Sequence, residues 1–258
     1  VKPANSLSVT IRTLDLGGDK VLNLAEREKE TNPFMGFRAI RYCLRNPDIF
    51  LLQLRAILRA SGHGEVKIMF PMISGVGEVI RAKNLLDRAK DELRSEKIEF
   101  DEKIEIGCMI ETPAAVTICD LLAHEVDFFS VGTNDLVQYL LAVDRVNNEI
   151  AYLYEPHHPA VIRSLQHVSQ VAKNMGKPIT VCGEIAGDPH FLPILLGLGF
   201  ENLSCAPPLL QELKFFGRRF TQIECEELVA EVLSMSRPVR IKEKLKEFYD
   251  LRVADLLA

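Results

Sequence analysis

The chain alternates short apolar runs with longer segments of helical period, and this alternation limits the possible folds more than any other feature of the sequence. Runs of four to seven residues, rich in β-branched and aromatic side chains, are typical of buried parallel strands. They predict six strands, at residues 8–12, 66–70, 104–110, 126–131, 178–182 and 202–205. Helical patterns are expected at residues 39–61 with a break near Asn46-Pro47, at 76–95, at 159–175, and at 221–257 with a split near Pro238. Strands that alternate with helices form βαβ units, so the sequence predicts an α/β protein with a parallel sheet.

A parallel sheet in a chain of 258 residues can be an open doubly wound sheet or a closed (β/α)8 barrel. The first predicted strand is not followed by a GxGxxG motif, which counts against a dinucleotide-binding sheet. A barrel needs eight strands, so we expect that two strands are missing at the N-terminal side. No linker or shift in composition divides the chain, and we therefore expect one domain over residues 1–258.

Composition excludes several classes of function. The 31 Lys and Arg against 36 Asp and Glu give a net charge of −5, which argues against a nucleic-acid partner. No run approaches the roughly eighteen apolar residues of a membrane helix, and no signal peptide is indicated. The six cysteines are far apart with no CxxC, as expected of reduced thiols, so we expect a cytoplasmic protein. Because the chain lacks an initiator Met, we expect a fragment of a longer protein.

Polar side chains follow the predicted strands at the end of each apolar run. Glu111 and Asp135 follow neighbouring strands. Two converging carboxylates favour a hard divalent cation such as Mg²⁺, whose other ligands are water molecules and substrate oxygens. The alternative is that each carboxylate only caps the helix that follows it. In a barrel the carboxyl ends of all strands open on one face, where active sites are built.

Three arginines and one cysteine are further candidates. Arg12 and Arg145 end or follow apolar runs and are expected to bind an anion, with Arg38 as a weaker third candidate, since a guanidinium matches phosphate or carboxylate bidentately. The alternative for each arginine is a solvated surface charge. Cys182 ends the fifth predicted strand, where a thiol can act as an acid or nucleophile or can simply be a small buried core residue.

Several longer motifs then show a resemblance to a known family. The motifs are RTLDLGGDK at 12–20, NPFMGFRAIR at 32–41, LRAILRAS at 54–61, MFPM at 69–72, MIETPAA at 109–115, DFFSVGTNDL at 127–136, LAVDR at 141–145 and CGEIAGD at 182–188. With these motifs, the chain between residues 8 and 206 resembles the phosphoenolpyruvate-binding barrel of the phosphoenolpyruvate–protein phosphotransferases, that is, enzyme I of the bacterial phosphotransferase system in its sugar or nitrogen branch. The GTND and CGE elements also occur in pyruvate phosphate dikinase, whereas the first motif indicates enzyme I.

The resemblance implies a role for each candidate. Glu111 and Asp135 would hold Mg²⁺ as the metal ligands. Arg12 and Arg145 would bind the phosphate and carboxylate of phosphoenolpyruvate with help from Arg38, and Asn134 would contribute through its backbone and amide. Cys182 would protonate the enolate at its methylene carbon to give pyruvate. The candidates are therefore expected to meet around one small pocket in a (β/α)8 barrel of the phosphoenolpyruvate/pyruvate kind.

The resemblance also implies partners and departures. The phosphoryl group would pass to the phosphohistidine domain of the same full-length protein and then to a phosphocarrier protein, and the barrel would form a homodimer. The chain is expected to lack the phosphohistidine domain and the helical domain that docks the carrier protein. It is also expected to lack the first two strands of the barrel, one of which ends in an Arg-Thr-Glu-Phe motif. Ser204-Cys205-Ala206 stands in place of Ser-Met-Ser, and Phe37 in place of Trp. The competing hypotheses are a metal-dependent lyase or aldolase acting through a pyruvate enolate, and a non-enzymatic module for dimerisation or ligand sensing.

Overall fold

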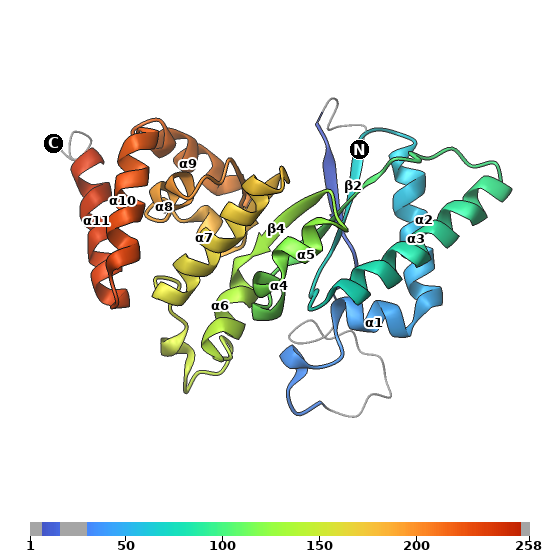
Figure 1. Ribbon diagram of the computed structural model, residues 1–258, viewed down its shortest axis with the longest axis horizontal. Helices are drawn as coiled ribbons and strands as arrows, with labels where there is room; N and C mark the ends of the chain where they lie inside the picture. The colour runs from blue at the N-terminus through green and yellow to red at the C-terminus, as the bar shows by residue number, and fades with distance from the viewer. Residues whose placement is uncertain (1–6, 16–29, 254–258) are drawn as a thin grey trace. The chain divides into compact units, whose positions relative to one another are not determined.

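The computed structural model describes residues 7–15 and 30–253 (Figure 1). Six β-strands lie in these residues, and each begins and ends within two residues of the predicted position. They are β1 (Val9–Arg12), β2 (Val66–Phe70), β3 (Glu105–Ile110), β4 (Phe128–Gly132), β5 (Ile179–Cys182) and β6 (Asn202–Ser204). The predicted strand positions are therefore confirmed.

Helices separate the strands along the chain. The α-helices are α1 (Ala39–Arg45), α2 (Pro47–Ser61), α3 (Val76–Ser95), α4 (Pro113–Thr117), α5 (Cys119–Ala123), α6 (Thr133–Leu141), α7 (Pro159–Asn174), α8 (Leu192–Gly197), α9 (Leu210–Gly217), α10 (Gln222–Ser234) and α11 (Pro238–Val253). Short 3-10 helices occur as η2 (Pro33–Met35), η3 (Ala151–Leu153), η4 (Glu184–Gly187) and η5 (Pro207–Leu209). The sequence patterns predicted α1, α2, α3, α7, α10 and α11, whereas α4, α5, α6, α8 and α9 were not predicted.

The chain divides into two compact units. The first unit extends to Ile110 and includes Asp120–Phe129; the second contains Glu111–Cys119 and the residues from Ser130 onward. All five residues of β4 are buried, and this strand begins in the first unit and ends in the second. The expectation of one domain over residues 1–258 stays a prediction.

In the first unit, β1, β2 and β3 are parallel neighbours. Val9 lies opposite Val66, and Lys67 lies opposite Glu105, with their side chains forming an ion pair of 2.6 Å. Helices α2 and α3 pack against each other, and their apolar faces are buried. Strand β2 is buried at nearly every position, as expected for a parallel strand covered by helices.

The break between α1 and α2 has a local cause. Asn46 lies between the two helices, and Pro47 occupies the first position of α2. Proline has no N–H to donate and has a fixed φ, so it is tolerated at the first turn of a helix but not within one. The predicted break is confirmed.

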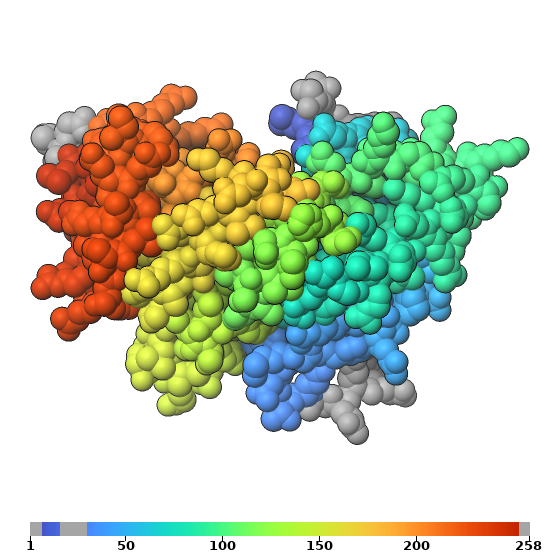
Figure 2. Space-filling model, in the orientation of Figure 1, coloured from blue at the N-terminus to red at the C-terminus, as the bar shows by residue number. Residues whose placement is uncertain are grey.

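In the second unit, β5 and β6 are parallel, with Thr180 opposite Asn202 and Cys182 opposite Ser204. Helix α8 packs on α10, and Gly197 allows a close approach, because a Cβ there would overlap the carbonyl of Cys225. Helices α10 and α11 lie side by side at the surface (Figures 1 and 2). Pro238 begins α11, which confirms the predicted split, while residues 254–257 of that prediction lie outside the described residues.

The fold class is confirmed as α/β. Within each unit, strands that are consecutive in the chain are parallel neighbours in the sheet, which is the arrangement in a (β/α)8 barrel. Six such strands correspond to a barrel of this kind without two of its eight. In the part of the chain that the structure describes, no helix is both long and apolar enough to cross a membrane.

Candidate functional site

Most of the candidate residues lie in the second unit, in the segments that follow β3, β4 and β5. Glu111 comes directly after β3, Asn134 and Asp135 are in the first turn of α6 directly after β4, and Cys182 is the last residue of β5. Arg145 lies four residues after the end of α6. The sequence placed Glu111, Asp135 and Cys182 at strand ends, and the structure has them there, whereas Arg145 follows a helix.

Glu111 does not act as a helix cap. Helix α4 is capped by Thr112, whose hydroxyl oxygen accepts a hydrogen bond of 3.1 Å from the backbone N–H of Ala115. Glu111 is only 2% exposed. Burying a carboxylate costs free energy unless a cation or several donors compensate its charge. The capping alternative is therefore disfavoured for Glu111, and a buried carboxylate at a strand end is chemically suited to bind a cation.

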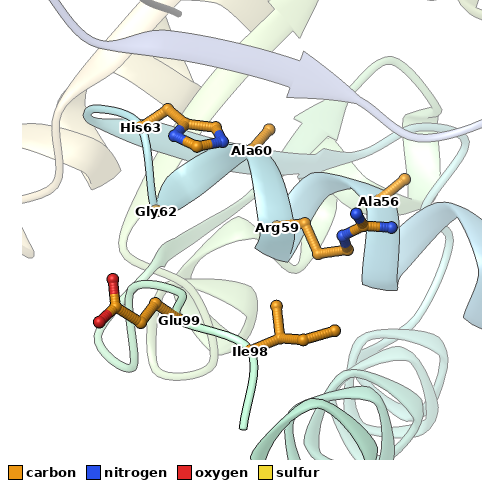
Figure 3. Close-up of a pocket in the computed structure, with 7 residues that line it drawn as sticks. All are labelled: Ala56, Arg59, Ala60, Gly62, His63, Ile98 and Glu99. Carbon is orange, nitrogen blue, oxygen red and sulfur yellow. The ribbon is translucent and has the colours of Figure 1, made fainter. Parts of the chain in front are cut away.

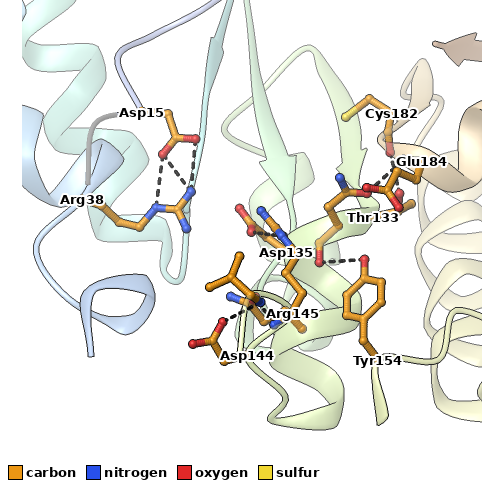
Figure 4. Close-up of polar contacts among 12 residues, drawn as sticks. Asp15, Arg38, Thr133, Asp135, Asp144, Arg145, Tyr154, Cys182 and Glu184 are labelled. Atoms are coloured by element: carbon orange, nitrogen blue, oxygen red, sulfur yellow. Dashed lines mark hydrogen bonds and ion pairs between the residues drawn. The ribbon is translucent and has the colours of Figure 1, made fainter. Parts of the chain in front are cut away.

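Asp135 and Arg145 form an ion pair, with 2.8 Å between Asp135 Oδ1 and Arg145 Nη1 (Figure 4). Asp135 is 6% exposed, so its charge is largely shielded from water. Ala142 adopts a left-handed conformation that ends α6 and turns the chain back. Gln138 then accepts a hydrogen bond of 3.2 Å from the backbone N–H of Arg145 through its side chain. These local contacts bring the guanidinium to the first turn of the helix that precedes it.

The start of α6 is also bonded to the end of β5. The Thr133 hydroxyl donates to the carbonyl of Cys182 at 2.7 Å, and the Asn134 side-chain oxygen accepts from the backbone N–H of Glu184 at 2.9 Å. Gly183 lies between these two contacts with a φ of +95°. A Cβ at this position would overlap the Thr133 hydroxyl and lie 2.7 Å from Asn134 Oδ1. Glycine is therefore required both for the backbone conformation and for the close approach.

The Cys182 thiol is half-buried and contacts polar groups of β4. Its sulfur lies 3.3 Å from the carbonyl oxygen of Val131, to which it can donate, and 3.6 Å from the Ser130 hydroxyl, which can donate to it. A hydroxyl that donates to the sulfur would stabilise the thiolate left after proton transfer. The role of Cys182 as an acid, rather than as a core residue only, stays a prediction.

Tyr154 is a member of this group that the sequence did not indicate. Its hydroxyl donates to the backbone carbonyl of Asn134 at 3.3 Å (Figure 4). Burial raises the pKa of the Tyr154 phenol to about 12, and the charges of Glu184 and Asp135 add to the increase against the opposite effect of Arg145. The phenol therefore keeps its proton near neutral pH and can act as a donor. No motif or period marks Tyr154, since it lies in the irregular segment between α6 and α7.

The other two candidates, Arg12 and Arg38, lie in the first unit and share one carboxylate. Arg38 is 1% exposed and binds Asp15 through both Nε and Nη2 at 3.0–3.2 Å (Figure 4). The Arg12 side chain is 38% exposed, with its Nη1 3.4 Å from Asp15 Oδ2. Asp15 was not among the predicted site residues, although it lies in the first motif. Arg38 is therefore a buried member of an ion-pair cluster, and Arg12 is accessible to solvent.

Glu111 and Asp135 are suited to a cation that also takes oxygen ligands from water and substrate. The described ranges contain no group of three or more His, Cys, Asp or Glu side chains that could enclose a metal ion. Glu111 and Asp135 offer hard oxygen ligands in buried positions, which suits Mg²⁺ but not a structural zinc site. The expectation that Arg12, Glu111, Asp135, Arg145 and Cys182 meet around one pocket stays a prediction.

One shallow pocket of the first unit contains none of these residues (Figure 3). Its lining includes Arg59, His63 and Glu99, from the segments that lead into the amino ends of β2 and β3. Within this unit Arg12 ends β1 at the carboxyl edge of the parallel strands β1 to β3, which is the opposite edge. The pocket therefore does not include Arg12.

Comparison with known proteins gives the family. A family model described as PEP-utilising enzyme, PEP-binding domain, matches residues 1–221. The phosphoenolpyruvate-protein phosphotransferases of Priestia megaterium and Bacillus subtilis (strain 168) are 46% and 44% identical to this chain over 94% of its length. Multiphosphoryl transfer protein 2 of Escherichia coli (strain K12) is 41% identical over 96% of this chain and 30% of that protein. The chain spans 42% of the length of the first two relatives.

Proposed function

The chain belongs to the PEP-utilising enzyme family, as a PEP-binding domain, and on this premise we propose that it binds phosphoenolpyruvate for phosphoryl transfer. The transfer would be Mg²⁺-dependent, would deliver the phosphoryl group to a histidine on a separate domain, and would release pyruvate as the first step of the phosphotransferase system. The observation that carries the proposal is the ion pair of the buried Asp135 with the partly exposed Arg145, on a helix turn bonded to the end of β5, in a chain whose relatives are named for this transfer.

Phosphoryl transfer needs positioning and charge neutralisation more than covalent help from the protein. Glu111 and Asp135 would hold Mg²⁺, which supplies positive charge to the phosphate oxygens when bound. Arg145 is within reach of the same carboxylate and is only 23% exposed, so its guanidinium is preorganised in a partly dry setting. Binding of the substrate would move Arg145 from Asp135 to the phosphate or carboxylate of phosphoenolpyruvate.

The remaining candidates would bind substrate or move a proton. Arg12, which is accessible, would bind the phosphate, while Arg38 would act mainly by holding Asp15. The Cys182 thiol would transfer its proton to the methylene carbon of the enolate, and the Ser130 hydroxyl would donate to the thiolate left behind. Asn134 would contribute its amide from the first turn of α6.

The wider setting follows from the family. The phosphoryl acceptor would be the phosphohistidine domain of the same full-length protein, followed by a phosphocarrier protein, in the cytoplasm. A homodimer is expected. A lyase or aldolase reaction through a pyruvate enolate is less well supported, because the relatives are named for phosphoryl transfer.

The proposal is tested by calorimetric titration of phosphoenolpyruvate with and without Mg²⁺. We expect binding to require the metal, and Arg145→Ala to weaken it more than tenfold, since a guanidinium–anion pair in a partly buried site is worth about 1.5–3 kcal/mol. Arg163→Ala, an exposed arginine on α7, is the matched control and should bind as the wild type does. Tight binding without metal, or an unaffected Arg145→Ala variant, would contradict the proposed site.

A further inference from the structure

The segment between α6 and α7 returns twice to the same turn of α6. At its beginning, Arg145 binds the side chain of Asp135 at 2.8 Å. At its end, the Tyr154 hydroxyl donates to the backbone carbonyl of Asn134 at 3.3 Å. The two attachment points are consecutive residues, so one turn of helix anchors both ends of the segment.

The same turn carries the groups that the proposed function uses. Asn134 and Asp135 lie in it, and Thr133 and Asn134 bond it to the backbone of Cys182 and Glu184. A shift of this turn would change the position of Asp135 relative to Cys182. Misplacement of reacting groups by about 1 Å can cost roughly 100-fold in rate.

The two attachments differ in what happens when substrate binds. Under the proposed function Arg145 exchanges Asp135 for an anionic group of the substrate, so its side chain leaves the first turn of α6, while its backbone N–H stays bonded to Gln138 one turn further along. Tyr154 donates to the backbone carbonyl of Asn134, a group to which the proposed function assigns no ligand. Its ring is half-buried, and its phenol is kept neutral near physiological pH. The Tyr154 attachment can therefore persist through the reaction.

We propose that Tyr154 is a positioning residue, whose hydroxyl holds the segment 143–158 on the first turn of α6 after Arg145 has transferred to the substrate. The inference rests on the proposed function for the reaction in question, but the attachment itself is a property of the fold. Tyr154 touches neither the phosphoryl group nor the enolate in this role. It acts through Asn134 and Arg145.

The first test needs no ligand. Hydrogen–deuterium exchange, followed by mass spectrometry of peptides from 133–158, is compared for the wild type, Tyr154→Phe and Tyr152→Phe. Tyr152 is two residues away and 79% exposed, so it is the matched control. We expect exchange several-fold faster in Tyr154→Phe alone. Equal protection in Tyr154→Phe and the wild type would overturn the attachment.

The second test measures the reacting centre without a phosphoryl acceptor. With Mg²⁺ in D₂O, Cys182 as thiolate removes a methyl proton from pyruvate: the C–H bond breaks, the electron pair forms the enolate, and an S–H bond forms. The thiol exchanges its proton with solvent and returns a deuteron to carbon, which NMR detects as loss of the methyl proton signal.

We expect Tyr154→Phe to slow this exchange about tenfold at saturating pyruvate, with Tyr152→Phe unchanged. Adding Asn134→Ala should lower the exchange rate by a smaller factor in the Tyr154→Phe variant than in the wild type, because both changes disturb the same turn. Unchanged exchange in Tyr154→Phe, or fully additive effects, would overturn the positioning role. Failure of the wild type to bind phosphoenolpyruvate or exchange pyruvate would instead reject the proposed function, and the first test would still decide the attachment.

Discussion

Asp135 shows how one buried carboxylate can serve two purposes. In the structure its charge is balanced by Arg145, and this pairing lowers the cost of burying it. A divalent cation can replace that balance, which releases the guanidinium for an anion. Before binding, the ion pair would thus compensate the buried carboxylate. During binding, Asp135 would hold the cation and Arg145 would bind the anion. Arg38 and Asp15 differ, because Arg38 is almost fully buried and its bidentate pairing is suited to a structural role.

Gly183 permits the closest backbone approach in this site, and we expect Gly183→Ala to destabilise the protein by about 2–4 kcal/mol. The substitution forces a residue with a Cβ into a φ of +95° and into overlap with the Thr133 hydroxyl. The free energy of unfolding, measured by urea titration, checks this value. Because the contacts to Cys182 and Glu184 would also shift, metal-dependent binding of phosphoenolpyruvate should weaken.

Gly176 provides the matched control for that prediction. It has a φ of +62°, but a Cβ there would have no neighbour within 4 Å. Gly176→Ala should therefore lower the free energy of unfolding only through the strain of a positive φ, by about 1 kcal/mol. If the two variants proved equally stable, steric overlap at Gly183 would not be the reason for its glycine.

At the scale of single elements, helix α10 begins with a reciprocal cap. The Thr221 hydroxyl accepts from the backbone N–H of Glu224 at 3.3 Å, and the Glu224 carboxylate accepts from the backbone N–H of Thr221 at 2.9 Å. Arg252 of α11 binds the other carboxylate oxygen at 2.7 Å. One glutamate thus caps the start of α10 and also pairs with a residue of α11.

These contacts predict an acid dependence of the C-terminal helices. The Thr221 backbone N–H, the Thr221 hydroxyl and Arg252 lower the pKa of Glu224 from 4.5 to about 2. The folded state thus prefers the ionised carboxylate, and its contribution is present above about pH 4.5 and lost as the pH falls toward 2. We expect the wild type to have a higher thermal midpoint than Glu224→Gln at pH 6, and the difference to shrink by pH 3.

Glu227→Gln on the same helix is the control for Glu224→Gln, because its side chain is exposed. It should change the midpoint little at either pH. A constant difference between the wild type and Glu224→Gln from pH 6 to pH 3 would show that the carboxylate charge does not stabilise the cap.

At the scale of the whole molecule, each unit buries an ionisable thiol that the folded state keeps neutral. Burial raises the pKa of Cys43 in the first unit to about 12, with a further increase from Asp15. In the second unit, burial raises the pKa of Cys225 to about 11, with an addition from Glu224. Neither thiol has a role in the proposed reaction, so their effect is on stability alone.

We therefore expect stability to fall as the pH rises above about 9, the ordinary value for a thiol. The unfolded chain loses these protons first, and each proton held only by the folded state lowers the free energy of unfolding by about 1.4 kcal/mol per pH unit. Urea titrations at pH 8, 9 and 10 should show a steeper decline in the wild type than in the double variant Cys43→Ala and Cys225→Ala. Parallel declines would contradict the prediction, since other alkaline effects act on both proteins equally.

Much of the fold could be predicted because its signals are local. The run 66–70 is β2 without a change of boundary, and the residues 76–95 form α3 as expected. Pro47 and Pro238 mark helix starts through a property of proline itself. The short helices α4, α5, α6, α8 and α9 were not predicted, because so few turns leave the apolar period poorly defined and tertiary packing determines them. Helix α1 is also short, but its pattern continues into that of α2.

The sequence by itself determined which residue types stand at the strand ends, because the order of strands and the residues after them are properties of the chain. It indicated Glu111, Asp135 and Cys182 on this basis, and Arg145 because it follows an apolar run. Only the tertiary structure decided that Arg145 binds Asp135 and that Tyr154 reaches Asn134. The physical reason is that these contacts join residues 10 and 20 positions apart through the path of an irregular segment. Neither period nor composition specifies that path.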